Sequence, residues 1–381
     1  MQVVQNTNSH PLFKGRGTTL NPENRFEHLK LEIEPEWLEL EPNLRIKTEY
    51  FVDSSQAILA KNESPDVGFN YSLNPYRGCE HGCVYCYARP THEFFGLSAG
   101  LDFETKIMVK QDAAELLDKA FRSSNWQPQV VAVSGNTDCY QPIEKHLRIT
   151  RNCLQVFLKF RNPLALITKN VLILRDLDIL QELAKFNLVR VTLSITTLDR
   201  TLARIMEPRT SAPEKRLEAV EQLASAGIPT YVNIAPLIPA LNEHEISAIL
   251  KEAAARGAVG AAYILLRLPH SVKELFSAWL QQHFPDRAAK VLHAIRETRD
   301  GKLSDPRFGT RITGEGIRAQ AIARMFELSC MRFGLTPHKY ELATEHFRRG
   351  KVEQRELFLR PENEVIKPPE DSKPSGGFYS P

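Results

Sequence analysis

The sequence contains little cysteine, only six residues in a chain of 381. Clustered cysteines in a short secreted chain indicate a disulfide scaffold, but this chain is long and otherwise poor in cysteine. Three of the six nevertheless lie within positions 79–86. A metal or cluster site explains this concentration better than a set of disulfide bonds.

Long apolar runs are also missing. The opening residues, MQVVQNTNSHPLFKGRG, contain no apolar core of a signal peptide, and no run elsewhere is long enough to cross a bilayer. We therefore expect a reduced, cytoplasmic compartment, thiolates available as ligands and no membrane partner. The net charge of +3 is small for this length, so charge alone does not argue for nucleic acid.

Composition divides the chain into four segments. Residues 1–65 are polar and predict an N-terminal extension, with one alternating stretch, RIKTEYFVD, that predicts a strand. Residues 66–285 form the main domain, and residues 286–365 a mostly helical C-terminal extension. Residues 366–381 are rich in Pro and Ser and predict a disordered tail.

Within the main domain, strand-sized apolar runs alternate with amphipathic segments. The runs lie at 129–135, 163–169, 188–195, 229–238 and 260–268, and their β-branched composition is typical of strands covered on both faces. With the strand that leads into Cys79, this makes about six βα units. The pattern predicts an α/β fold, an incomplete (β/α)6 barrel of parallel strands, with a doubly wound open sheet as the alternative.

Several helices have recognisable faces and ends. Gly227 is expected to stop a helix that starts near Pro213, and Asn242 with Glu245 resembles a capping box. The helix within 146–160 is predicted to bury one stripe, made of Cys153, Val156, Phe157 and Phe160. A C-terminal helix is predicted to bury another, made of Ile322, Met325, Phe326, Ser329, Cys330 and Phe333.

The clustered cysteines, Cys79, Cys83 and Cys86, form C-x3-C-x2-C in the loop expected after the first barrel strand. Active sites of parallel barrels gather at the carboxyl ends of strands, so the location suits chemistry. Three thiolates are one short of the four that usually close a cluster or a structural zinc site, and a [4Fe–4S] cluster held by three leaves one iron open. A zinc site with His81 or a distant residue as fourth ligand is the alternative, although no second CxxC completes it and His81 is expected to point elsewhere.

The C-x3-C-x2-C spacing, with Tyr85 just before the last cysteine, resembles the radical S-adenosylmethionine (radical SAM) superfamily. That resemblance runs from Val67 to the 280s. More narrowly, NPYRGCEHGCVYCYARPTHEFFG, GNTDCYQPIE and EPRT resemble a bacterial family of radical SAM proteins related to spore photoproduct lyase. The narrower resemblance extends over most of the chain, including KGRG and NPENRF near its start.

In that superfamily, SAM chelates the open iron, and an electron from the cluster cleaves it to methionine and a 5′-deoxyadenosyl radical that abstracts hydrogen from a substrate. The resemblance therefore implies a [4Fe–4S] cluster on Cys79, Cys83 and Cys86 and SAM as second cofactor. It also implies a reductant such as flavodoxin or ferredoxin. The sequence does not identify the substrate.

Five further residues are implied as SAM contacts. Tyr85 would meet the adenine through its backbone or ring, while Thr137 and Asp138 would accept from the ammonium group. Lys169 would supply a cation for the carboxylate, and Ser194 would contact the ribose. The alternative for each is an ordinary polar residue at a strand end, although their shared location at successive strand ends argues against coincidence.

Two arginines have competing interpretations. Arg209 could reach the SAM carboxylate or an anionic substrate, or it could anchor its loop by pairing with Glu207. Arg77 is another candidate anion partner, or else a residue that braces the loop.

The remaining cysteines are expected to differ in role. Cys139 is a candidate catalytic residue, a hydrogen-atom donor beside Asp138, with packing as the alternative. Cys153 and Cys330 lie on apolar helical faces, where a buried cysteine usually acts as a small hydrophobic residue.

Two other functions compete with a new radical SAM activity. One is an iron–sulfur protein in regulation or electron transfer without SAM turnover, which would need no SAM-binding residues at strand ends. The other is a DNA-lesion lyase like spore photoproduct lyase, whose hydrogen-donor cysteine lies just ahead of the SAM-binding polar residues. The matching positions here, Ser134, Gly135 and Asn136, carry no thiol, so we expect a different reaction.

Support for a nucleic-acid substrate is thin. Arg318, Arg324 and Arg332 lie along the C-terminal helix, but such charges are typical of a solvated face. A dedicated DNA-binding surface is expected to carry a denser basic stripe.

Overall fold

The computed structural model describes residues 15–26, 46–336 and 341–349. The predicted disordered tail, residues 366–381, lies outside these ranges, as does the end of the predicted C-terminal extension. In the described part, no helix has the length and apolar character needed to span a membrane.

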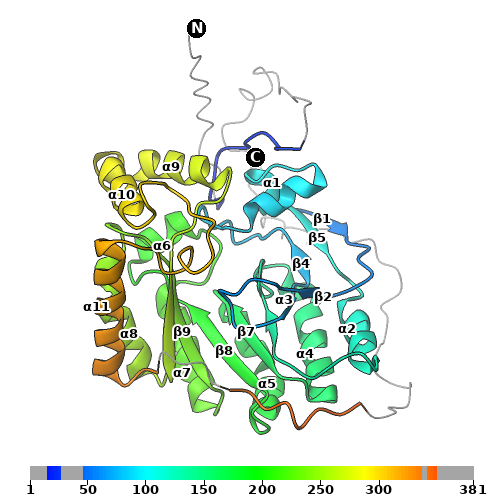
Figure 1. Cartoon of the computed structure of the whole chain (residues 1–381). Helices are drawn as coiled ribbons and strands as arrows, with labels where there is room; N and C mark the ends of the chain where they lie inside the picture. The colour runs from blue at the N-terminus through cyan, green and yellow to red at the C-terminus, as the bar shows by residue number, and fades with distance from the viewer. Residues whose placement is uncertain (1–14, 27–45, 337–340, 350–381) are drawn as a thin grey trace, which may run out of the picture.

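A seven-stranded sheet forms the centre of the molecule (Figure 1). Its spatial order is β10-β9-β8-β7-β6-β3-β2, and every neighbouring pair is parallel except β2 with β3. The strands are β2 (Leu59–Lys61), β3 (Tyr71–Leu73), β6 (Val131–Val133), β7 (Leu164–Thr168), β8 (Val189–Ser194), β9 (Thr230–Leu237) and β10 (Gly260–Leu265).

The strand order decides between the two predicted architectures. A doubly wound sheet reverses its order at a switch point, whereas here each parallel strand lies beside its predecessor from β3 to β10. The α/β fold with an incomplete (β/α)6 barrel is therefore confirmed, and the doubly wound alternative is wrong. The barrel stays open because the two edge strands, β10 and β2, do not pair with each other.

Amphipathic helices cover the outside of the barrel (Figure 1). They bury their apolar stripes against strand residues that face outward, such as Val131, Val191 and Ile234. The helices that follow the barrel strands are α4 (Ile149–Phe160), α5 (Leu177–Ala184), α7 (Pro213–Ser225) and α8 (Ile246–Ala255), with α2 (Ala113–Arg122) packed on α4. Short helices also occur at α3 (Glu144–Leu147), Val171–Asp176 and Glu243–Glu245.

Two helix predictions are confirmed at the level of side chains. The stripe of α4 is buried as expected, with Phe157 packed against Phe121 at a centroid distance of 5.4 Å. Helix α7 starts at Pro213 and ends just before Gly227, whose φ of +75° suits glycine.

The predicted capping box at Asn242 is wrong. The Asn242 side chain caps no helix but accepts from the Ile238 amide at 2.6 Å and donates to the Thr196 carbonyl at 2.8 Å. Glu245 instead accepts from the Leu198 amide at 2.7 Å. These contacts outcompete the local cap because the two side chains bond backbone groups of Ile238, Thr196 and Leu198.

A second, three-stranded sheet lies beside the barrel in the order β1-β5-β4. Its strands are β1 (Glu49–Val52), β4 (Tyr76–Arg77) and β5 (Lys106–Val109), flanked by α1 (Leu101–Thr105) and a 3-10 helix at Arg89–Phe95. Strand β1 confirms the strand expected within RIKTEYFVD. Since β2 pairs with the barrel strand β3, residues before position 65 join the main sheet, and the proposed domain boundaries stay a prediction.

The C-terminal part is helical, as expected. Helices α9 (Val272–His283) and α10 (Pro285–Glu297) lie with α6 (Arg200–Met206) over one end of the barrel (Figure 1). Helix α11 (Ile317–Phe333) packs along α8 and buries Ile322, Phe326, Ser329 and Cys330 from the predicted stripe. Because α6 and α9 follow β8 and β10, this end holds the carboxyl ends of the strands.

Replacing Phe157 by Ala should lower the free energy of unfolding by about 3–5 kcal/mol, because the ring is fully buried and leaves a cavity. Urea denaturation followed by circular dichroism measures the change. Met331→Ala is the control: its side chain is 75% exposed on α11, so the change should stay within about 0.5 kcal/mol. Equal stability of the two variants would contradict the assigned core.

Candidate functional site

The cysteine loop begins two residues after β4, which pairs antiparallel with β5. Gly78 makes the turn with φ of +76°, and a Cβ there would come within 2.8 Å of the His92 ring. The Cys79 amide then donates to the Phe103 carbonyl at 2.9 Å. The chain thus leaves the barrel after β3, joins the small sheet and returns with the loop over the barrel.

The three loop cysteines are free thiols held close together. Cys79 is 7% exposed, Cys83 is 9% exposed and Cys86 is half-buried. Burial raises the pKa of all three, and the neighbouring Cys83 and Cys86 raise that of Cys79 further. Thiolates at this place need a strong positive partner, which a bound iron cluster provides. The donor set therefore fits a metal cluster.

A fully buried arginine holds this loop in shape. Arg89 donates from Nε to the Cys83 carbonyl at 2.9 Å and from Nη2 to Glu104 Oε1 at 2.5 Å. The other Glu104 oxygen accepts from the Gly17 amide at 2.9 Å, and a Cβ on Gly17 would overlap the Gly82 carbonyl. This explains why part of the KGRG motif packs against a loop more than sixty residues away. Neither Arg89 nor Glu104 was predicted to have a role from the sequence, although Arg89 lies in CYARPT, directly after the cysteine motif.

A second buried network holds Tyr85. Its hydroxyl donates to Glu207, which also accepts from Thr196 at 2.5 Å and pairs with Arg216 at 2.5 Å. Burial alone would raise the pKa of Glu207, but the charges of Arg216 and Lys169 and the hydrogen bonds lower it to about 2. The phenol of Tyr85 is thus engaged, and its contact with adenine stays a prediction.

Arg209 anchors its loop through a different carboxylate from the one expected. Glu207 pairs with Arg216, whereas Arg209 lies 3.2 Å from Glu80. The pairing of Arg209 with Glu207 is therefore wrong. Residue types alone did not separate the two arginines, because Arg216 is brought to Glu207 by the start of α7.

Arg77 stabilises its loop, which is the alternative to anion binding that the sequence suggested for it. Its Nε lies 2.5 Å from Asp53 Oδ2, and its guanidinium lies over the Phe95 ring at 5.0 Å.

Asp138 lies beside the cysteine loop, but its carboxylate is fully engaged by the protein. Oδ1 accepts from the Thr168 hydroxyl at 2.7 Å and the Tyr140 amide at 2.9 Å, and Oδ2 from the Lys169 amide at 2.8 Å. Burial acts to raise the pKa of Asp138, but His81, 3.4 Å away, and these hydrogen bonds lower it to about 2.

His81 accordingly faces Asp138 and Asn170 rather than the thiols. Among residues 15–26, 46–336 and 341–349, no three His, Cys, Asp or Glu side chains are arranged around a single metal ion. The zinc alternative with His81 as ligand therefore has no support. Thiolates of a four-iron cluster lie farther apart than the ligands of one zinc ion.

Lys169, at the end of β7, presents a cation toward the loop. Its Nζ lies 6.0 Å from the Tyr85 ring centroid and makes no hydrogen bond or ion pair within the described chain. The positive charge acts to lower the pKa of Cys83 and Cys86, against the effect of burial. This is the one predicted SAM contact whose charged group is left available.

Thr137, in the loop after β6, and Ser194, the last residue of β8, are both buried. The Thr137 hydroxyl donates to the Tyr76 carbonyl at 2.7 Å, so it supports the turn into the cysteine loop. Ser194 lies opposite Asn233 on β9, and its carbonyl accepts from Arg216 at 2.9 Å.

Asn233 was missed by the sequence analysis. It is 8% exposed, and its Oδ1 has no hydrogen-bond partner, which is rare for a buried polar atom in the part of the chain described. Its register neighbours are Ser194 on β8 and Ala262 on β10. The sequence feature that could have identified Asn233 is an asparagine inside the apolar run PTYVNIAPLI.

Cys139 has no exposed surface and lies in the hydrophobic core. Its amide donates to Ser134 Oγ at 2.8 Å, and burial raises the pKa of its thiol well above the usual range. This placement favours packing over hydrogen-atom donation. Cys153 and Cys330 are buried in the core, as expected.

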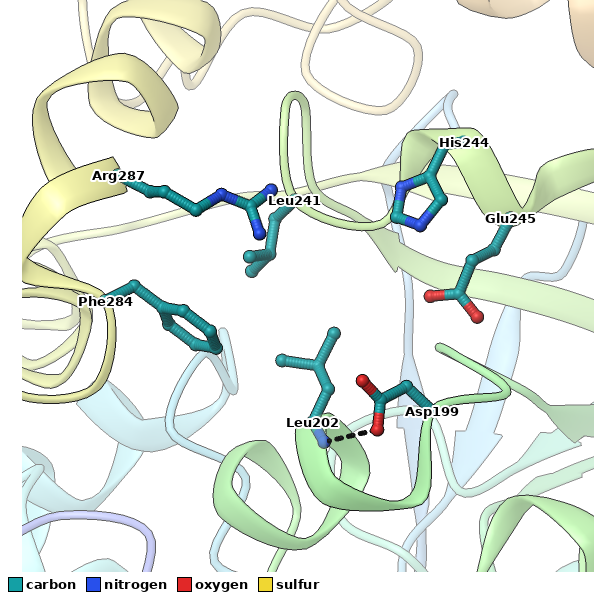
Figure 2. Close-up of a pocket in the computed structure, with 7 residues that line it drawn as sticks. All are labelled: Asp199, Leu202, Leu241, His244, Glu245, Phe284 and Arg287. Atoms are coloured by element: carbon teal, nitrogen blue, oxygen red, sulfur yellow. Dashed lines mark hydrogen bonds between the residues drawn. The ribbon is translucent and has the colours of Figure 1, made fainter.

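A hollow of about 270 Å³ lies away from these groups, between α6, the 3-10 helix at Glu243–Glu245 and α10 (Figure 2). Its Asp199 accepts from the Leu202 amide, and Glu245 and Arg287 are bonded to backbone groups. No loop cysteine or predicted SAM contact lines it. The lining residues are Asp199, Leu202, Leu241, His244, Glu245, Phe284 and Arg287.

Comparison with known families matches residues 73–253 to the Radical SAM superfamily. An uncharacterized protein of Mycobacterium tuberculosis is 34% identical over 242 residues, which are 62% of this chain and 71% of that protein. An uncharacterized protein of Methanocaldococcus jannaschii is 33% identical over 184 residues, 48% of this chain and 66% of that protein.

Similar solved structures include spore photoproduct lyase complexed with dinucleoside spore photoproduct. It has a TM-score of 0.55 and 18% identity, covering 76% of this chain and 82% of that one. A variant of that lyase with bound AdoMet and dinucleoside spore photoproduct has a TM-score of 0.54 and 18% identity, covering 75% and 80%. At this identity the likeness concerns the fold alone. Because the family match spans all three loop cysteines and strands β6 to β9, the chain belongs to the radical SAM superfamily.

Proposed function

We propose that the protein is a radical SAM enzyme with a [4Fe–4S] cluster on Cys79, Cys83 and Cys86. The observation that carries this is the set of three free thiols, two of them buried, beside the Lys169 cation, which has no ion-pair partner among the described residues. When bound, the cluster supplies the electron that splits SAM into methionine and a 5′-deoxyadenosyl radical, which abstracts hydrogen from the substrate.

Different residues around the cysteine loop would bind different groups of SAM. Lys169 would hold the SAM carboxylate, since a free cation is what a carboxylate needs. Ser194 and the unpartnered Asn233 Oδ1 would meet ribose hydroxyls from adjacent strands. Asp138, whose oxygens are already bonded, and Thr137, whose hydroxyl donates to the Tyr76 carbonyl, would shape the loop that presents Lys169.

The two competing functions have less support. An iron–sulfur protein without SAM turnover needs neither the free Lys169 cation nor the orphaned Asn233 oxygen. A lesion lyase like spore photoproduct lyase needs an accessible hydrogen donor, and Cys139 is buried in the core.

Nucleic acid as substrate is also weakly supported. On α11, Arg318 pairs with Glu243 and Glu297, and Arg324 with Glu327, so carboxylates of the same protein neutralise these charges. A flavodoxin or ferredoxin as reductant, and a cytoplasmic location, stay predictions from the sequence.

Replacement of any one of Cys79, Cys83 or Cys86 by Ala should abolish the visible absorbance of the reconstituted cluster, because each supplies an irreplaceable thiolate. Iron and acid-labile sulfide, measured anaerobically, should fall in parallel. Cys153→Ala is the matched control and should keep its cluster, since that thiol lies in the core. A triple variant with full iron and sulfide would refute the ligand assignment.

Lys169→Gln should weaken SAM binding to the intact holo-protein about tenfold or more, because a charge-assisted contact contributes about 1.5–3 kcal/mol. Equilibrium dialysis with labelled SAM measures the affinity. Lys215→Gln, which removes an exposed lysine paired with Glu218, should leave it unchanged. An unaltered affinity in the Lys169 variant, with cluster content preserved, would remove this role.

The reduced holo-protein should release 5′-deoxyadenosine from SAM, as detected by liquid chromatography under anaerobic conditions. It should not convert DNA carrying the spore photoproduct to thymines over multiple turnovers. Absence of any SAM cleavage would favour the electron-transfer alternative. Repair of the lesion would contradict the packing role of Cys139.

A further inference from the structure

The open side of the barrel is bridged by the segment that follows α10. The Leu265 amide at the end of β10 donates to the Ile312 carbonyl at 2.9 Å. On the other side, Asp66, between β2 and β3, pairs with Arg311 and accepts from the Gly309 amide at 2.6 Å. The two unpaired edge strands are thereby joined through one connection.

Arg267 lies beside this bridge, two residues past the end of β10. Its guanidinium lies over the Tyr87 ring, 5.2 Å from the centroid. Tyr87 directly follows Cys86, and its hydroxyl donates to the Gly135 carbonyl in the loop after β6. These contacts place Arg267 at the carboxyl end of the barrel, near the cysteine loop.

The Arg267 guanidinium is half-buried and makes no hydrogen bond or ion pair with any residue that the structure describes. Its stacking on Tyr87 orients the group through the ring face, so the N–H donors at its edge stay available. An arginine fixed in this manner, without using its donors, is suited to a ligand with a pair of acceptor oxygens.

The neighbouring carboxylate of Asp66 does not pair with Arg267. Both oxygens of Asp66 are taken by Arg311 and the Gly309 amide, and Arg311 itself acts to lower the pKa of Arg267 alongside burial. Arg299, fully buried, donates to the carbonyls of Leu265 and Leu266 and has no partner for its Nε. Burial and the charge of Arg267 lower the pKa of Arg299 to about 10.

Carboxylates farther along the same segment are also occupied. Asp305 and Glu315 both pair with Arg307, although both also act to raise the pKa of Arg299. Among the arginines of this part of the described chain, Arg267 is therefore the one whose N–H donors are left available to a ligand.

We propose that Arg267 binds an anionic group of the substrate, a carboxylate or a phosphate, at the carboxyl end of the barrel. The assignment of an anionic group to the substrate rests on the proposed function as a radical SAM enzyme. Tyr87 is the positioning residue, since it aims the guanidinium without accepting its hydrogen bonds. Arg267 is distinct from the proposed contacts Lys169, Ser194 and Asn233, which lie just after β7 and on β8 and β9, because it follows the last strand.

The test is isothermal titration of the anaerobic holo-protein with bound SAM, using inorganic phosphate and, separately, acetate at low ionic strength. We expect saturable binding of at least one, weakened about tenfold or more in Arg267→Gln, as expected for loss of a charge-assisted contact. Phosphate alone would indicate a phosphorylated substrate, and acetate alone a carboxylate. Arg267→Lys, which keeps the charge but not the planar fork, should lose less affinity than Arg267→Gln.

Arg324→Gln is the control, because its arginine is exposed and paired with Glu327; it should bind as the unaltered protein does. Thermal melting checks that each variant is folded. The proposal is overturned if neither anion binds saturably, or if Arg267→Gln binds both as well as the unaltered protein. It is also overturned if Arg267→Gln lowers the affinity for SAM but leaves the affinities for phosphate and acetate unchanged. Since titration reads binding and not turnover, this outcome is separate from any failure to cleave SAM.

Discussion

The guanidinium of Arg89 makes five hydrogen bonds in a fully buried position, and the shape of the cysteine loop depends on them. Four go to backbone carbonyls, including those of Gly82 and Cys83, and the fifth goes to Glu104. A buried charge is tolerated only when its donors are satisfied and an opposite charge is near, and here both conditions are met. Three thiols can therefore lie together in one short irregular loop without regular secondary structure to support them.

Two segments distant in sequence complete this support. Glu104 extends the network to the Gly17 amide, so a motif near the start of the chain packs on the loop. From the barrel side, Glu207 with Arg216 fixes the Tyr85 hydroxyl between the second and third cysteines. The loop is thus held from both sides by buried carboxylate–arginine pairs. Removing one partner of either pair would leave an uncompensated charge in the interior.

The incomplete barrel leaves polar groups that a closed core would not contain. Among the residues that the structure describes, the Asn233 side-chain oxygen, the Lys169 ammonium group and the Arg267 guanidinium have no hydrogen-bond partner. Their positions follow the strands: Lys169 directly follows β7, Asn233 lies within β9 opposite Ser194, the last residue of β8, and Arg267 follows β10. Polar groups left unsatisfied in a folded protein cost free energy, so their retention at one end of the barrel is consistent with ligands that complete them.

The sequence by itself determined the strand and helix alternation and the buried stripes of α4 and α11, because apolar periodicity is a local property of the chain. It also identified the three cysteines, since their spacing is contained in one loop. Tertiary structure alone decided the strand order, the pairing of Arg216 with Glu207, the saturation of Asp138 and the failed cap at Asn242. Each depends on which segments meet in space. A carboxylate or amide in a sequence shows what it can bond, but burial and neighbouring strands decide which partner it receives and which group, like Arg267, is left without one.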